Sequence, residues 1–423
     1  MTARERGVLA ASGVVLVVAV AAMGALESPH RCVPLFLAAY AVGFAAYAVA
    51  VREVVRTHAT GRAALWGLFV VAIAARAAVV PARPDLSTDI YRYLWEGRVI
   101  LSGANPFMTT PSDTSLAALR DGTYDLVNHK SLPTIYPPLA QGLFAAAAWI
   151  RPNVTALKII FSLFDVATIA LLVVLLRARG RPPTHALVYA WSPLVIVETG
   201  HSGHVDAAGV FLLVLGLVLW QRGRRLGAGL AFGASLLVKY LAVALAPLLV
   251  RRGGVRALAA MGVVAALGYA AFLDAGPHLL GSLRVYGGTW WFNGPPFMAL
   301  AGFLGDATVA RRLLAGFGVA FMLVAARREH DPVRYLYLVT GCALVVSPTV
   351  YPWYLLWMVP LLCIYPNRAW IAFTGLVALS YAVWVEYDRS GAWRVPTWLL
   401  AVEYVPFYGL LAHGLWSKGT RRA

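Results

Sequence analysis

The chain has 423 residues, of which 60% are hydrophobic and only 13% are charged, and its mean hydropathy is +0.70. Because roughly a quarter of the residues in an ordinary soluble domain are charged, this composition excludes a soluble globular protein and indicates a membrane protein. The formal net charge of +17 does not indicate a nucleic-acid partner, since the basic residues form short clusters between apolar runs and not one basic face.

Continuous apolar runs predict an all-α fold of transmembrane helices. The first runs along the chain are residues 7–23, 32–51, 64–80 and 156–176. Each approaches the ~20 apolar residues that span a hydrocarbon layer. A barrel strand would alternate apolar and polar residues, and these runs do not. The first run resembles the apolar part of a signal peptide but lacks a small-residue cleavage site, so we interpret it as a helix.

Basic clusters predict the topology through the positive-inside rule. We expect the clusters within residues 4–6, 52–62, 177–181, 222–225, 251–256, 327–334 and 418–422 to face the cytoplasm. Both termini are then cytoplasmic in a multi-pass protein of the inner (plasma) membrane. Two outer loops follow, at about residues 81–138 and 274–312. We expect residues 1–423 to form a single integral membrane domain.

The middle of the chain predicts broken helices. Residues 138–150 form a re-entrant or surface helix, because a full span there would place the basic cluster 177–181 on the wrong side. Residues 187–197 and 208–220 are predicted spans, and the segment 230–250 has Lys239 at its centre, which indicates two half-helices lining a cavity. The remaining predicted helices are 257–273, 313–326, 335–346, 354–365, 370–385 and 398–415, for a total of about 12 to 14 spans.

Several segments carry a family resemblance. They are "DIYRYLWEGRVILSGANPF", "TIYPPLAQGLF", "WSPLVIVETGHSGHVDA", "LLVKYLAVALAPLLV" and "SPTVYPWYLLWMVPLL". In this order the sequence resembles the GT-C superfamily of membrane glycosyltransferases, most closely the bacterial polyprenyl-phosphate-mannose-dependent mannosyltransferases. The resemblance implies a lipid-linked sugar donor, an inverting transfer on the outer side and a catalytic carboxylate in the first outer loop, at Asp89. The family pattern has histidine where this chain has Tyr351, and we expect Tyr351 to contact the sugar or acceptor.

The residues around Asp89 allow more than one interpretation. A carboxylate just above the membrane can act as the base that activates a sugar hydroxyl. The sequence Ser-Thr-Asp before an apolar run is also typical of a helix cap, and Asp85 is a second candidate base. Tyr91 and Tyr93 have the spacing of either an aromatic belt or a sugar-binding platform.

Basic residues are the candidates for binding the donor phosphate. A lysine such as Lys239 among apolar residues costs about 3 kcal/mol, so it normally faces a cavity or a partner, although it could also snorkel from a helix end. Arg92 and Arg98 bind phosphate or pair with Glu96 on an exposed helix face. Arg284 contacts the phosphate or caps its loop. We expect Asp89 and Lys239 to open onto one cavity.

His201, His204 and Asp206 lie close together in a predicted outer turn. Three candidate ligands without a fourth are a weak metal pattern, so a contact with sugar hydroxyls or phosphate, or a plain polar turn, is favoured. We expect neither a metal nor another cofactor, with a divalent cation left open. Glu198, earlier in the same segment, is expected to be buried and paired with one of the histidines.

Trp290 and Trp291, in the second outer loop, either stack on the acceptor or anchor the loop at the interface. The function implied by the resemblance is transfer of a sugar, foremost mannose, from a polyprenyl-phosphate donor to a glycolipid or glycan acceptor in the bilayer. The alternatives are a transporter or flippase of a lipid-linked or anionic substrate and an outer-face glycan ligase. A transporter is disfavoured because its ionisable residues would lie near the midplane, where this chain places only Lys239.

Overall fold

The computed structural model describes residues 2–57, 61–252 and 254–419, and within them every named element is a helix. The all-α fold is therefore confirmed. An isolated bridge joins Phe292 and Thr349. The α-helices of eight or more residues are α1 (Ala3–Gly24), α2 (Val33–Thr57), α3 (Arg62–Val79), α4 (Asp89–Leu101), α5 (Pro138–Ile150), α6 (Val154–Ala178), α9 (Asp206–Gln221), α10 (Arg225–Leu236), α12 (Val255–Ala270), α13 (Gly281–Thr289), α14 (Pro295–Leu304), α15 (Ala307–Arg328), α16 (Pro332–Val346), α18 (Arg368–Leu376), α19 (Val383–Ser390) and α20 (Thr397–Gly419).

Within the described residues, six helical segments are long and apolar enough to cross a membrane: α1, α2, α3, α6, α15 and the run Arg368–Ser390 that includes α18 and α19. A seventh arises if α12 and the following segment Leu273–Thr289, bent by 111°, are one broken span. These are fewer than the 12 to 14 spans predicted, because other apolar segments form helices of only 10–17 residues. The protein is a multi-pass membrane protein whose interior contains many short and interrupted helices.

Two of the interruptions fall where the sequence predicted them, and a third does not. Residues 138–150 form the short helix α5, and α10 ends at Leu236 before an extended residue, Lys239, at φ −156° and ψ 141°. The chain continues through the 3₁₀-helix Tyr240–Leu245 into α11 (Ala246–Arg251). The segment 187–197 was predicted as one span, but it forms α7 (Leu187–Ala190), α8 (Pro193–Ile196) and a π-helix. Proline supplies no N–H, so Pro193 begins a new helix.

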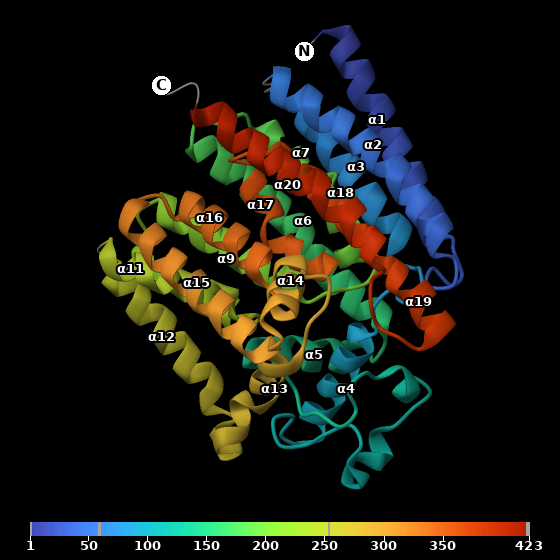
Figure 1. The fold of residues 1–423 in the computed structure, drawn as a ribbon, viewed down its shortest axis with the longest axis vertical. Coiled ribbons are helices and arrows are strands. Elements are labelled where there is room, and N and C mark those ends of the chain that lie inside the picture. The colour runs from blue at the N-terminus through green and yellow to red at the C-terminus, as the bar shows by residue number, and fades with distance from the viewer. Residues whose placement is uncertain (1, 58–60, 253, 420–423) are drawn as a thin grey trace.

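The two ends of the described chain lie at the same end of the helical bundle. In Figure 1, the start of α1 and the end of α20 lie at the top of the helical bundle, and the segment between α3 and α5 lies at the opposite end. The sides of the membrane that the termini and the first loop face stay a prediction. Arg421 and Arg422, which belong to the last predicted cytoplasmic cluster, lie outside the described residues.

Helix α4 is held in the first loop by close packing on α5. A Cβ atom added at Gly97 would lie 2.3 Å from the carbonyl oxygen of Phe144, so only glycine allows this approach. One turn earlier, Tyr93 stacks on the Phe144 ring with centroids 4.5 Å apart. Because residues four apart share a helix face, Tyr93 and Gly97 pack on α5 together. This packing fixes α4, and Asp89 in its first turn and Arg92 both line the interior cavity.

Candidate active site

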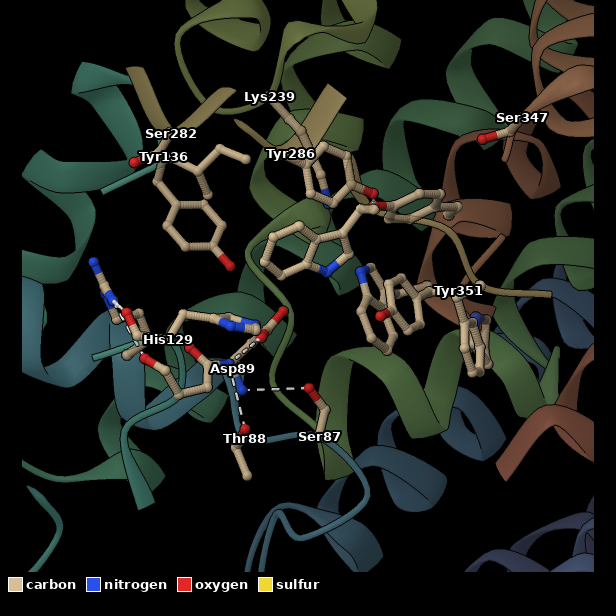
Figure 2. Close-up of a pocket in the computed structure, with 18 of the residues that line it drawn as sticks. Ser87, Thr88, Asp89, His129, Tyr136, Lys239, Ser282, Tyr286, Ser347 and Tyr351 are labelled. Carbon is tan, nitrogen blue, oxygen red and sulfur yellow. Dashed lines mark hydrogen bonds between the residues drawn. The ribbon is translucent and has the colours of Figure 1, made fainter. Parts of the chain in front are cut away.

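A cavity of about 870 Å³ lies where the first loop meets the broken helix and the C-terminal third of the chain. Asp89 and Lys239 both line it, which confirms the expectation that they share one cavity. In Figure 2, Asp89 and His129 lie close together, Lys239 and Tyr286 lie above them, and Tyr351 lies across the cavity. The lining is rich in aromatic rings with few polar groups, as is common for ligand sites.

Asp89 is the first residue of α4 and is partly exposed. Its Oδ1 accepts a hydrogen bond from Asn128 Nδ2 at 2.7 Å, and its backbone N–H donates to Ser87 Oγ at 3.3 Å. Among the described residues, no hydrogen bond reaches Oδ2. Neither Asp89 nor Thr88, the residue before the helix, caps α4 through its side chain, so the helix-cap interpretation is wrong. One carboxylate oxygen is therefore fixed, and the other is open to the cavity.

Arg92 and Glu96 form a buried ion pair, with 2.6 Å between Nε and Oε1. The other carboxylate oxygen of Glu96 accepts from Thr134 at 2.8 Å and from Gln141 at 2.6 Å. The prediction that Arg92 pairs with Glu96 is confirmed. The prediction that the pair lies on an exposed helix face is wrong, because the first loop and α5 cover this part of α4. Every oxygen of Glu96 is satisfied, so this carboxylate is structural.

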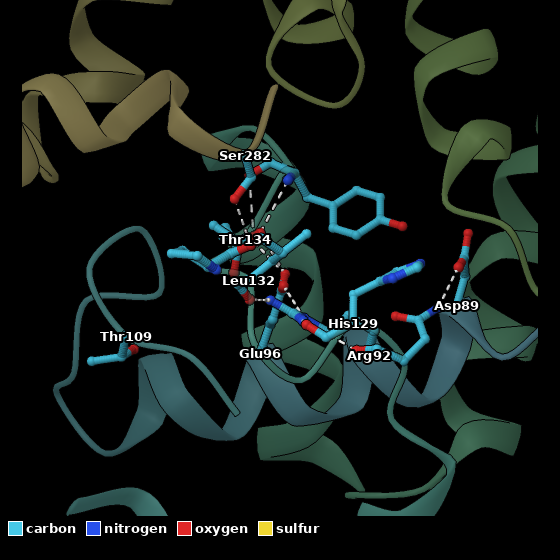
Figure 3. A network of polar contacts seen from close by, with 12 residues as sticks. Asp89, Arg92, Glu96, Thr109, His129, Leu132, Thr134 and Ser282 are labelled. Atoms are coloured by element: carbon cyan, nitrogen blue, oxygen red, sulfur yellow. Dashed lines mark hydrogen bonds and ion pairs between the residues drawn. The ribbon is translucent and has the colours of Figure 1, made fainter. Parts of the chain in front are cut away.

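The same arginine holds the loop that supplies Asn128. The guanidinium of Arg92 donates to the carbonyl oxygens of Asn128 at 3.3 Å, His129 at 3.0 Å and Leu132 at 2.8 Å. Figure 3 shows this network extending from Glu96 toward Asp89. The N–H groups of Arg92 thus donate to Glu96 and to these carbonyl oxygens. These contacts do not support the predicted role of Arg92 in binding the donor phosphate. Arg92 instead fixes the loop that orients Asp89.

His129 follows Asn128 in a left-handed backbone conformation, at φ 46°. Its ring packs edge-on against Trp290, with centroids 4.9 Å apart. Burial lowers the pKa of His129, although the nearby Asp89 carboxylate opposes this shift and Arg92 adds to it. The imidazole is therefore neutral near pH 7 and adds no positive charge beside Asp89.

Lys239 donates to both carboxylate oxygens of Asp206 at 2.7 Å. Trp357 Nε1 also donates to Asp206 at 2.6 Å, and the ammonium group lies 5.1 Å from the centre of the Tyr354 ring. The Lys239 side chain remains 26% exposed, whereas Asp206 is fully buried. Lys239 thus faces the cavity with a partner and does not snorkel. Asp206 was predicted to contact the sugar, but its oxygens are already occupied and it lies behind Lys239.

His201 and His204 are buried away from the cavity, contrary to their predicted role at an outer turn. The π-helix Val197–His201 carries this segment into the interior. Nδ1 of His204 lies 3.0 Å from Glu198 Oε2, so the predicted pairing of Glu198 with a histidine is confirmed. The His204 ring stacks on Trp353 at 4.2 Å. The described residues contain no group of three metal-binding side chains.

Other predicted site residues divide between the cavity and the surface. Trp290 and Tyr351 line the cavity, whereas Trp291 and Arg284 are exposed and do not. Arg98 pairs with Asp121 instead, outside the cavity, and this hydrogen bond holds the pKa of the Asp121 carboxyl well below its usual range.

Tyr91 and Tyr93 are buried and do not line the cavity, so they form no sugar platform. Tyr93 lies one turn after Asp89 on the same helix face, but the rings of Phe144 and Tyr136 cover it, with centroids 4.5 Å and 4.9 Å away. Residues that sequence reasoning missed include Asn128, Tyr136, Tyr286 and Trp384, all of which line the cavity. The only sequence signal for Asn128 was its position in the polar first loop.

Comparison with known families gives two matches. Residues 2–252 match the model described as "Alpha-(1->6)-mannopyranosyltransferase, N-terminal domain", which is more than half of the chain. Residues 302–411 match the "MptB C-terminal domain". No curated protein and no solved structure matches the chain. The cavity draws Asp89 and Lys239 from the first matched region and Tyr351 from the second.

Proposed function

Because the chain belongs to the alpha-(1->6)-mannopyranosyltransferase family and is therefore a glycosyltransferase, we propose that it transfers mannose from a polyprenyl-phosphate donor to a glycolipid or glycan acceptor on the outer face of the plasma membrane. The observation that carries the proposal is the cavity shared by a carboxylate with a free oxygen, Asp89, and a cation, Lys239. Both termini are cytoplasmic in this orientation.

Asp89 is the general base of the proposed reaction. Its Oδ2 accepts the proton of an acceptor hydroxyl while the hydroxyl oxygen attacks the anomeric carbon of mannose. Oδ1 is held by Asn128 throughout, so the free oxygen keeps a constant direction. Attack from the side opposite to the departing phosphate inverts the configuration at the anomeric carbon.

Lys239 faces the place where negative charge increases. The bond between the anomeric carbon and the phosphate oxygen breaks with its electron pair on the phosphate, and a fixed cation stabilises that charge. Tyr286 and Tyr354 beside it share a hydrogen bond between their hydroxyl groups and line the same part of the cavity. No metal ion or cofactor takes part in the proposed steps.

The experiment is transfer from radiolabelled polyprenyl-phosphate-mannose in membrane vesicles. Asp89→Asn preserves shape and the contact with Asn128 but removes the base, and we expect the rate to fall by about 10²- to 10⁴-fold. Asp113→Asn is the matched control, because Asp113 lies in the same loop and does not line the cavity. Among the described residues, its carboxylate accepts a hydrogen bond only from Thr110 N, at 2.7 Å.

Two outcomes would contradict the proposal. Wild-type vesicles that transfer mannose from no polyprenyl-phosphate donor would remove the donor assignment. An Asp89→Asn variant as active as Asp113→Asn would remove the base, and it would favour a ligase in which another residue activates the acceptor.

A further inference from the structure

One end of the cavity is formed by aromatic side chains that the reaction above does not use. We name Trp384, Tyr387 and Trp393 the aromatic mouth; all three line the cavity. Trp384 and Trp393 meet edge to face at 4.8 Å, and Tyr387 and Trp393 do so at 5.6 Å. Tyr387 is 45% exposed and Trp393 is 41% exposed. The rings therefore border both the cavity and the surroundings of the protein.

The aromatic mouth is tied to the segment that carries Asp89. Nε1 of Trp384 donates to the carbonyl oxygen of Leu86 at 3.1 Å, and Leu86 lies three residues before Asp89 in the chain. This hydrogen bond fixes the indole ring relative to the start of α4. A ligand resting on the mouth would thus have a defined position relative to the Asp89 carboxylate.

Lys239 is separated from the aromatic mouth by stacked rings. Lys239 lies beside Tyr354, which contacts Tyr351 edge to face at 5.8 Å. Tyr351 stacks on Phe292 at 4.5 Å, and Phe292 reaches Trp393 at 6.3 Å. Tyr351 and Phe292 therefore lie between the cation and the mouth, and a donor phosphate at Lys239 would leave the mouth free.

The charges around the mouth indicate a polar ligand and not a lipid chain. Glu386, Asp388, Arg389 and Arg394 surround the rings in sequence, and Asp388, Arg389 and Arg394 are exposed. Glu386 Oε1 lies 3.8 Å from Arg394. Such a density of charge is unfavourable in hydrocarbon. Aromatic faces flanked by carboxylates and guanidinium groups suit a sugar ring, which offers apolar C–H faces and hydroxyl groups at its edge.

We propose that the aromatic mouth is the acceptor subsite, where a hexose of a saccharide acceptor packs on Trp393 and directs its hydroxyl group toward Asp89. This proposal rests on the proposed function, since it assigns the acceptor of that same reaction. It requires Asp89, the base, to lie next to the acceptor. It also requires the donor phosphate at Lys239 to lie on the other side of the stacked rings of Tyr351 and Phe292.

The kinetic test uses Trp393→Ala with α-1,6-linked mannotriose as acceptor and polyprenyl-phosphate-mannose as donor. We expect the KM for the trisaccharide to rise about tenfold and the KM for the donor to stay unchanged. Trp393→Phe, which keeps a ring, should remain close to wild type. Trp398→Ala is the control, because Trp398 is 68% exposed but does not line the cavity. An acceptor KM for Trp393→Ala equal to that of Trp398→Ala overturns the proposal.

A binding test separates this proposal from the proposed function. Equilibrium dialysis of radiolabelled mannotriose against the purified full-length protein, without donor, measures the subsite alone. Binding that is present in wild type and lost in Trp393→Ala supports the subsite even where no transfer occurs, and only the proposed function then fails. A wild-type protein that does not bind the trisaccharide overturns the subsite.

Discussion

Asp89 and Asp206 are carboxylates beside the same cavity, but their oxygens are used differently. Each is the first residue of its helix, α4 or α9, where the helix dipole favours negative charge. Asp206 is fully buried and accepts from Lys239 and Trp357. Asp89 is partly exposed, and among the described residues its side chain accepts only from Asn128, through one oxygen. The helix position is the same, so the neighbours decide the chemistry.

The difference teaches which acid can receive a proton. An ionised carboxylate has two oxygens that accept hydrogen bonds. Donors from Lys239 and Trp357 occupy both oxygens of Asp206, so this acid is suited to holding a cation in place. The free oxygen of Asp89 is suited to taking a proton from a substrate. The comparison predicts that substitutions near Asp206 change the stability of the protein and the position of the Lys239 ammonium group. Substitutions near Asp89 should instead change the rate of the chemical step.

After Asp89→Asn, the largest effect is expected from Asp206→Asn. This variant removes the charge that pairs with Lys239, which costs about 2 kcal/mol of unfolding free energy, below the range for a fully buried pair because Lys239 is partly exposed. We expect mannosyl transfer to fall roughly hundredfold, because the cation is no longer fixed toward the phosphate. Thermal unfolding in detergent and vesicle transfer assays measure the two effects.

A double variant separates these effects. Asp206→Asn combined with Lys239→Met removes both charges, so we expect its stability to recover relative to Asp206→Asn while transfer stays low. Transfer that recovers together with stability would show that Lys239 has only a structural role.

Sequence reasoning found the features that depend on the cost of placing charges in apolar surroundings. The break at Lys239 was predicted in this way. The short helix 138–150 was predicted from the positive-inside rule, and the pairing of Glu198 with a histidine from their closeness in the sequence. Continuous apolar runs likewise predicted the long helices. These signals are local, because a charge or a proline within an apolar run has few acceptable structures.

The features that sequence reasoning missed depend on contacts between distant segments. Trp357 and Asp206, which share a hydrogen bond, are 151 residues apart in the chain, so the partner of Lys239 could not be chosen from its neighbours. The orientation of α4 depends on Gly97 packing against Phe144, and this packing buries Tyr93. Asn128 lies in no recognisable motif and gains its role only because the loop folds over Asp89.

Asn128→Ala tests whether the hydrogen bond from Asn128 positions the Asp89 carboxylate for the reaction. Without the 2.7 Å hydrogen bond, the carboxylate turns more freely, and we expect kcat to fall about tenfold or more while the KM for the donor stays unchanged. A residue that only supported the fold would change both constants together with thermal stability. Initial-rate kinetics with purified protein measure this difference.

Asn105→Ala is the matched control for this substitution. Asn105 lies in the same loop and donates to Asp274 at 2.8 Å, but it does not line the cavity. Equal kcat values for the Asn105 and Asn128 variants would contradict a positioning role for Asn128.

The smallest effect is expected at a third carboxylate, Asp331. Both of its oxygens accept hydrogen bonds, as in Asp206, but it does not line the cavity. Arg179 donates to Asp331 Oδ1 at 3.0 Å and Tyr365 donates to Oδ2 at 2.6 Å, and none of the three residues lines the cavity. Burial alone would raise the pKa of Asp331, but these hydrogen bonds outweigh it and lower the pKa.

The sign of the pH dependence follows from that lowered pKa. The folded-state pKa lies below the unfolded value of about 3.9, so the stabilisation is complete above that pH and is lost as the pH falls through the folded-state pKa. Asp331→Asn keeps the cap on Val333 N but removes the charge. We expect it to lower the unfolding free energy by about 1 kcal/mol at pH 7, with the difference from wild type vanishing at the acid end. Thermal unfolding from pH 7 to pH 3 measures this, and transfer at pH 7 should be unchanged. A loss of transfer as large as that of Asp206→Asn would contradict the comparison. It would show that removing any fully hydrogen-bonded carboxylate lowers activity, whether or not the carboxylate lies beside the cavity.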